Sequence, residues 1–261
     1  MHPRVSLHQV AFLDRTTEEF LDHCRKIGVS YATLVADMAA QLAEPPAGIA
    51  IAALNRAFAV HPDIERDSGE AAARLNETIE LAERLCANSV YLVTGGRGAL
   101  DWEAAAARFA ELVAPCRERA ERAGIELLVE NASPFNADIH MAHTLSDTLR
   151  LAEIADIGVC IELHACWAEA GLSELFRRAM PRCGLVQVSD YVLGDRVAPC
   201  RAVPGDGAIP LEHLLGDLLD AGYAGVFDIE LVGPRIAEEG PEAATERAAE
   251  HVSALLERLG A

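Results

Sequence analysis

A single (β/α)8 barrel covering residues 1–261 is the α/β fold that this sequence predicts, and two observations predict it. Eight short apolar runs follow one another along the chain, and most of the segments between them carry apolar residues at helical spacing. The runs are nearly continuous in valine, isoleucine and leucine, as expected for parallel strands buried on both faces. A chain of 261 residues is a common length for one such barrel, and no low-complexity linker marks a second domain.

The eight apolar runs give the expected strands in chain order. Several of them begin shortly after a glycine that follows a helical pattern, and glycine supplies the left-handed conformation that commonly ends a helix. The expected strands are residues 5–11, 29–36, 48–54, 89–94, 125–130, 157–162, 184–189 and 225–231.

Helical spacing accounts for the segments between these runs. The apolar positions that recur at this spacing are Leu75, Ile79, Ala82 and Cys86 in one segment, Leu145, Leu149 and Ala152 in a second, and Leu211, Leu214, Leu215 and Leu218 in a third. A last helix is expected over about residues 241–259, so that strands and helices alternate to the end of the chain.

The alternative fold is a doubly wound open sheet. That fold favours a glycine-rich phosphate-binding turn directly after the first strand, but the sequence there reads AFLDRTTEE. The glycines of TGGRG, residues 94–98, follow the fourth run and lack the spacing of a dinucleotide fingerprint. These residues are interpreted as a loop, and the barrel is preferred.

The composition restricts the partners of the protein. With 22 basic and 41 acidic residues, the net charge of −19 disfavours nucleic acid, whose binding depends on lysine and arginine. The apolar runs are too short to span a membrane, and the first residues do not read as a secretory signal. The seven cysteines form no CxxC pair, which suits reduced thiols. We therefore expect a cytoplasmic protein that binds neither nucleic acid nor membrane, with a homo-oligomer left open.

Polar side chains stand at the ends of the last four expected strands. Glu130 ends LLVE, Glu162 ends VCIE, Gln187 lies in LVQVSDY and Glu230 follows VFDI. Active sites of such barrels lie at these carboxyl ends, where three carboxylates would repel one another unless a cation joined them. Three carboxylates and an amide oxygen suit Mn²⁺ or Mg²⁺ better than Zn²⁺. One such glutamate alone would more often be solvated or salt-bridged, but the four residues together favour a metal site.

Two further segments belong to the same pattern: CRAVPGDGAIPL (residues 200–211) and GYAGVFDIEL (residues 222–231). Together with the four strand-end residues, they resemble the xylose-isomerase-like superfamily of sugar isomerases and epimerases. The pattern is most similar to that of hydroxypyruvate-isomerase-like members, and it is clearest over residues 124–235. The resemblance implies that Glu130, Glu162, Gln187 and Glu230 hold a divalent metal, Mn²⁺ or Mg²⁺ with Zn²⁺ as the alternative.

The resemblance also implies a reaction on a small sugar or keto-polyol. Glu130 and Glu230 would be the catalytic pair that moves a proton through a metal-stabilised enediolate, giving an isomerase or epimerase. Arg201, in the loop that matches the Arg and Pro-Gly-x-Gly pattern of the family, would bind substrate oxygens. The family's apurinic endonucleases need a histidine-rich three-metal cluster and a cationic face, and this sequence has neither.

Histidines supply further candidates for substrate binding. The family usually ends its sixth strand with Asp-x-x-His, whereas this chain reads Glu162-Leu-His164-Ala165, so His164 lies one position early. His140, in the long loop after the fifth strand, is a second candidate, with an ordinary surface histidine as its alternative. His8, on the first strand, is expected to pack inside the barrel.

Two other functions stay open beside the isomerase or epimerase. The same proton abstraction followed by loss of a hydroxyl group gives a dehydratase of the keto-inositol or dehydroshikimate type. The changes at Glu162 and Ala165 would also fit a degenerate barrel that binds sugar without catalysis.

Overall fold

The chain forms a closed eight-stranded barrel in a computed structural model that describes residues 1–61 and 63–261. Each strand is parallel to its neighbours, and β1 pairs with β8 to close the ring. The strands are β1 (Val5–His8), β2 (Tyr31–Val35), β3 (Ala50–Ala57), β4 (Ser89–Val93), β5 (Glu126–Glu130), β6 (Gly158–Glu162), β7 (Cys183–Val188) and β8 (Phe227–Ile229). The predicted (β/α)8 barrel is confirmed.

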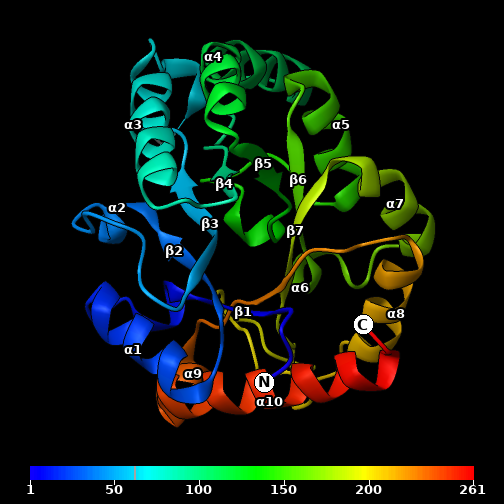
Figure 1. The fold of residues 1–261 in the computed structure, drawn as a ribbon. Coiled ribbons are helices and arrows are strands. Elements are labelled where there is room, and N and C mark those ends of the chain that lie inside the picture. Colours follow the sequence, from blue (N-terminus) through cyan, green and yellow to red (C-terminus); the bar gives the residue numbers. More distant parts are fainter. Residues whose placement is uncertain (62) are drawn as a thin grey trace.

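Helices surround this ring of strands, as Figure 1 shows in a view along the barrel. They are α1 (Thr17–Ile27), α2 (Ala36–Ala39), α3 (Glu70–Arg84), α4 (Trp102–Ala123), α5 (Leu145–Ala155), α6 (Leu163–Cys166), α7 (Leu172–Ala179), α8 (Leu211–Asp220), α9 (Pro234–Glu239) and α10 (Pro241–Leu259), with 3-10 turns at Gln9–Phe12, Ile64–Arg66, Pro134–Asn136 and Met180–Arg182. Each long helix buries an apolar stripe against the barrel, which is what the helical spacing of its leucines and alanines predicts.

The strand boundaries differ from the expected ones in two informative places. The first strand ends at His8, because the ring nitrogen Nδ1 of His8 accepts a hydrogen bond from the backbone of Val10 and a 3-10 turn follows. The third strand begins two residues later than expected and continues to Ala57. Its last residues, Asn55–Ala57, interrupt the apolar run and are paired with β4, a contact that periodicity along one strand does not reveal.

The strand pairing brings the candidate residues together near the carboxyl ends of the strands. Glu162 pairs with Gln187, Gln187 pairs with Asp228, and Glu130 pairs with Cys160. Since side chains alternate along a strand, Glu130, Glu162 and Gln187 face the same side as the residues two positions earlier. Those residues form a small interior layer that contains Leu128, Cys160 and Leu185. The candidate side chains therefore form the next layer toward the carboxyl ends of the strands.

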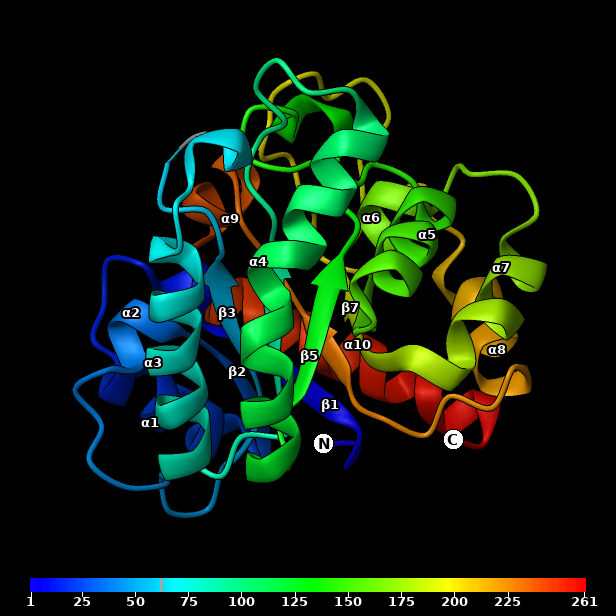
Figure 2. The ribbon, with the colours of Figure 1, turned by 90° about the horizontal axis from the view of Figure 1, so that it is seen from above.

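The two ends of the barrel differ. In Figure 2 the arrow of β5 points to the end where the long loops after β5 and β7 gather, while both chain termini lie near the opposite end. There the backbone N–H of His2 donates to Ser253 Oγ of α10. Across residues 1–61 and 63–261, no helix combines the length and the apolar character that crossing a membrane would require.

Candidate functional site

The site begins with three glutamates, which we call the acidic cluster: Glu130, Glu162 and Glu230. They come from the carboxyl ends of β5 and β6 and from the residue after β8, and all three are buried. The backbone N–H of Glu230 still donates to Val188 on β7, so this residue continues the sheet beyond the last residue of its strand. The sequence-based expectation that these strand ends lie at one end of the barrel is therefore realised in the fold.

Glu162 is fixed by two sets of contacts. Its carboxylate oxygen Oε1 accepts from the backbone of His164 at 2.9 Å and so caps the short helix α6. Its backbone is held by the side-chain amide of Asn131, which accepts from Glu162 N at 2.9 Å and donates to Glu162 O at 2.8 Å. The sequence placed Asn131 beside Glu130 but gave no sign of this bridge, because it depends on the pairing of two strands.

The guanidinium group of Arg201 lies among the carboxylates of the acidic cluster. Its Nη1 atom is 2.6 Å from Glu162 Oε1 and its Nη2 atom is 3.1 Å from Glu230 Oε2, and only 13% of the side chain is exposed. Nη1 also donates to Ser189 Oγ at 3.2 Å. Arg201 lies in the loop that the sequence predicts, but its guanidinium group is buried among the carboxylates.

Asp190 holds the loop that carries Arg201. One oxygen of this buried carboxylate accepts from the backbone of Gly205 and Gly207, and the other accepts from Tyr191 and Ile209, at 2.8 to 3.0 Å. A side chain at residue 207 would lie 2.3 Å from the Asp190 carboxylate, so glycine is needed there. The carboxylate thus fixes residues 205–209 against the end of β7.

Burial and mutual repulsion shape the charges of the acidic cluster. Burial raises the pKa of Glu130 well above its usual value, and the nearby Glu230 and Glu162 raise it further while Arg201 opposes the shift. Burial also raises the pKa of Glu230, but its ion pair with Arg201 acts in the opposite direction. Glu130 is therefore the carboxylate of this cluster that most needs a further positive charge to stay ionised.

Several polar atoms of the site lack partners. Among the residues that the structure describes, Glu130 Oε2, Glu230 Oε2 and both amide atoms of Gln187 are buried and accept or donate no hydrogen bond. The contact between Glu230 Oε2 and Arg201 is an ion pair without hydrogen-bond geometry. Buried polar atoms without partners are costly, and these atoms belong to three of the five residues that meet at this end of the barrel.

These unpaired atoms test whether a divalent cation fits. Carboxylate and amide oxygens are the donors that Mn²⁺ and Mg²⁺ prefer, and Glu130, Glu230 and Gln187 each offer one that is buried and has no hydrogen bond. The donor set therefore fits such an ion in chemistry. In the described part of the chain, however, no three His, Cys, Asp or Glu side chains converge closely enough to hold a metal as they stand.

A cavity opens beside the acidic cluster at the carboxyl ends of the strands, and we call it the C-terminal cavity. It has a volume of about 280 Å³. Glu130, Glu162 and Arg201 form its charged floor, while Phe135 and Pro199 belong to its apolar wall. This volume suits a small molecule of sugar size.

His164 lines this cavity, although it lies one position earlier than the histidine of the resembled family. Because α6 begins directly after Glu162, the backbone turns and brings the His164 ring to within 3.9 Å, Nε2 to Sγ, of Cys200. Burial lowers the pKa of His164, so a neutral imidazole faces the cavity. Its assignment to substrate binding stays compatible with this position.

The other histidine candidates lie elsewhere. His140 is fully buried; its Nδ1 atom accepts from the backbone of Thr94 and its Nε2 atom bonds the carbonyl oxygen of Glu130. Because both ring nitrogens are used and the ring does not line the C-terminal cavity, we reassign His140 from substrate binding to support of the Glu130 backbone. His8 packs inside the barrel as expected, with Nε2 2.6 Å from the hydroxyl of Tyr91.

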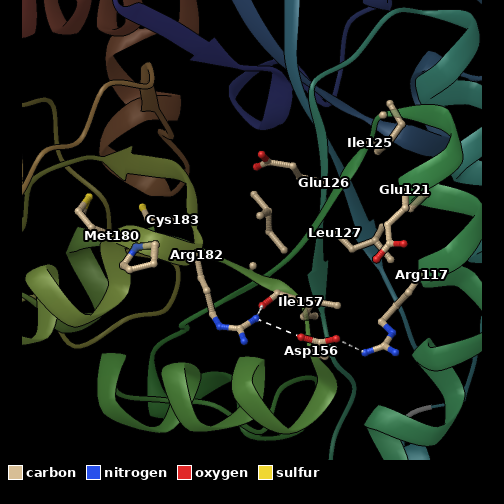
Figure 3. A pocket seen from close by; sticks show the side chains of 15 residues that line it. Arg117, Glu121, Ile125, Glu126, Leu127, Asp156, Ile157, Met180, Arg182 and Cys183 are labelled. Atoms are coloured by element: carbon tan, nitrogen blue, oxygen red, sulfur yellow. Dashed lines mark hydrogen bonds and ion pairs between the residues drawn. The ribbon is translucent and has the colours of Figure 1, made fainter.

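A larger cavity, of about 700 Å³, lies at the other end of the strands and is shown in Figure 3. We call it the N-terminal cavity. The carboxylate of Asp156 lies between Arg117 and Arg182 and forms ion pairs with both. Glu126 points into the same space, but the charged groups do not converge on one point. In barrels of this kind the amino-terminal end serves stability, and we do not place the chemistry there.

Comparisons with known proteins agree with this geometry. The sequence model of the family described as "Xylose isomerase-like TIM barrel" matches residues 8–255. A curated relative, fructoselysine 3-epimerase of Escherichia coli O157:H7, is 26% identical over 151 residues, which cover 57% of this chain and 53% of the relative. The match thus spans about half the length of that protein.

Solved structures share the fold over nearly the whole chain. Protein SMc04130 from Sinorhizobium meliloti 1021 has a TM-score of 0.84 at 22% identity, covering 95% of this chain and 96% of its own. The IOLI protein, whose structure carries a bound zinc atom, has a TM-score of 0.82 at 17% identity and covers 98% of both chains. At these identities the likeness concerns the fold.

Proposed function

The chain belongs to the family of xylose isomerase-like TIM barrels, and on this premise we propose that it is a divalent-cation-dependent isomerase or epimerase of a small sugar or keto-polyol. The observation that carries the proposal is the buried acidic cluster, in which Glu130 and Glu230 each have an oxygen without a hydrogen bond, beside a cavity of about 280 Å³ that Glu130 and Glu162 line. The names of the relatives, a sugar epimerase and a zinc-binding barrel, support the same reading.

The cation would be held by Glu130, Glu162, Gln187 and Glu230. When bound there, it would polarise the carbonyl group of the substrate and favour the loss of a proton from the neighbouring carbon. Mn²⁺ or Mg²⁺ suits the oxygen donors best, and Zn²⁺ is the alternative.

The proton itself is moved by the protein. Glu130 and Glu230 come from β5 and β8, which are not neighbours in the barrel, so a substrate can lie between their carboxylates. One carboxylate removes the proton next to the carbonyl group, and the other returns a proton to the opposite face or to the adjacent carbon. Arg201 donates to a substrate oxygen as negative charge develops on it.

The walls of the C-terminal cavity select a small substrate with both polar and apolar faces. The floor offers charged groups to hydroxyl and carbonyl oxygens, whereas Phe135 and Pro199 offer surface to the C–H face of a sugar. His164, neutral and half-buried, can accept or donate one further hydrogen bond.

The proposal is tested by incubating the purified protein with Mn²⁺ and a panel of ketoses and keto-polyols in D₂O and following the products by NMR. An isomerase or epimerase incorporates deuterium at the carbon next to the carbonyl group and keeps all hydroxyl groups. A product that has lost water would establish a dehydratase instead, and binding without exchange would establish a sugar-binding barrel.

A matched pair of variants ties the reaction to the site. Glu230→Gln should abolish deuterium exchange, because the amide cannot take up the proton. Glu121→Gln removes the same charge at the N-terminal cavity, far from the acidic cluster, and should leave exchange unchanged. Equal loss in both variants would contradict the proposed role of Glu230.

A further inference from the structure

The position of Arg201 bears on how the site would take up a cation. The guanidinium group contacts two of the three glutamates, with its Nη1 atom 2.6 Å from Glu162 Oε1 and its Nη2 atom 3.1 Å from Glu230 Oε2. The backbone fixes this placement, since Arg201 N donates to Val232 O and the next residue, Ala202, pairs with Asp190. Arg201 is therefore built into the cluster and is not a flexible surface residue.

The charges of this group do not balance. When Glu130, Glu162 and Glu230 are ionised, one guanidinium group leaves two negative charges uncompensated in a buried place. A divalent cation would supply the missing charge, but it would then stand close to a permanent positive charge. Repulsion between the divalent cation and the guanidinium group is strong when both lie beside the same carboxylates and water is largely excluded.

The two positive charges also share an oxygen. Glu230 Oε2 is the atom that faces Arg201 and is also one of the buried oxygens without a hydrogen bond. Glu162 Oε1 is engaged by Arg201 and by the backbone of His164. With Arg201 bridging two carboxylates, the three glutamates are not drawn together around one point, which agrees with the lack of a closed ligand set among the described side chains.

We propose that Arg201 is an internal competitor of the divalent cation. Its guanidinium group neutralises Glu162 and Glu230 when the cation is absent, and it weakens cation binding by repulsion and by occupying Glu230 Oε2. This role is additional to any contact with substrate, and the inference depends on the proposed cation site but not on the proposed reaction.

The test measures Mn²⁺ affinity by isothermal titration calorimetry on wild type and on Arg201→Met, which keeps the length of the side chain and removes its charge. The variant should bind Mn²⁺ more tightly, on the order of tenfold to a hundredfold. Without metal its melting temperature should fall, because Glu162 and Glu230 lose their counter-ion, and the rise on adding Mn²⁺ should exceed that of wild type. Arg201→Gln repeats the measurement should the methionine variant fail to fold.

Two controls separate charge from structure. Arg201→Lys keeps a positive charge at the same place and should bind Mn²⁺ as weakly as wild type. Arg235→Met removes a positive charge from an exposed ion pair with Asp195 and should leave the affinity unchanged.

The outcomes are distinct. Equal or weaker Mn²⁺ binding by folded Arg201→Met and Arg201→Gln, with binding by wild type, would overturn the competition and leave the proposed cation site standing. Absence of binding in wild type and in all Arg201 variants would overturn the cation site and the competition together.

Discussion

Replacing Gln187 by leucine should stabilise the metal-free protein and weaken its binding of Mn²⁺. The side chain is fully buried, and neither of its amide atoms has a hydrogen-bond partner within residues 1–61 and 63–261. An unpaired buried polar atom costs about 1–3 kcal/mol, so an apolar side chain of similar size should raise the free energy of unfolding by about 2 kcal/mol. In a chain of this length that corresponds to a rise of about 4–8 °C in melting temperature.

The same change removes a proposed ligand, so Mn²⁺ affinity should fall while stability rises. Thermal unfolding after treatment with EDTA and calorimetric titration with Mn²⁺ measure the two effects separately. Gln9→Leu is the matched control: Gln9 is equally buried, but its amide donates to Thr17 and accepts from Val35 N, so its loss should destabilise the protein. A lower melting temperature for the Gln187 variant, or an unchanged Mn²⁺ affinity, would refute the reasoning.

Three further outcomes are expected. In Asp190→Asn the amide N–H₂ faces two backbone N–H donors, either those of Gly205 and Gly207 or the two that bond the other carboxylate oxygen. The loss of these bonds should lower the free energy of unfolding by about 2–4 kcal/mol. Hydrogen exchange should accelerate at residues 205–209, and unchanged protection there would contradict the role of Asp190. Phe135→Ala should raise the KM for the substrate identified in the panel without lowering the melting temperature, since 71% of Phe135 is exposed; an unchanged KM would remove Phe135 from the binding wall. Burial lowers the pKa of His23, so the unfolded chain takes up a proton first as pH falls below about 6.5. Stability measured by urea unfolding should therefore decrease from pH 7 to pH 5, and less steeply in His23→Gln; equal slopes would exclude His23 as the cause.

The fold could be predicted from the sequence because its signals are local. Apolar runs and helical spacing lie within single segments, and the last helix begins and ends where its pattern does, at Pro241 and Leu259. That Glu130, Glu162 and Gln187 lie at one end of the barrel was also predictable, since parallel strands of a barrel end at one face. The assignment of these residues to a metal stays a prediction that the experiments above address.

Contacts between distant segments could not be predicted in this way. Nothing near Arg201 in the sequence shows that its guanidinium group reaches two strands, and nothing near His140 shows that Thr94 and the Glu130 backbone occupy its ring. Spacing identifies which face of a strand a residue occupies, but the partners of a polar side chain depend on loops whose path is set by the whole fold. The four backbone bonds to Asp190 are a further example.

The pairing of β1 with β8 has a consequence for the order in which the protein assembles. Ser6 and Asp228 join across this seam by a hydrogen bond of 2.6 Å, although 222 positions separate them in the chain. Contacts of such long separation are slow to form, because the entropy of closing the loop must be overcome first. A growing chain on the ribosome can pair its first seven strands in turn. The pairing of β1 with β8 can form only after the segment that also contains Glu230 has been synthesised. The ring and the proposed site are thus completed by the same late event.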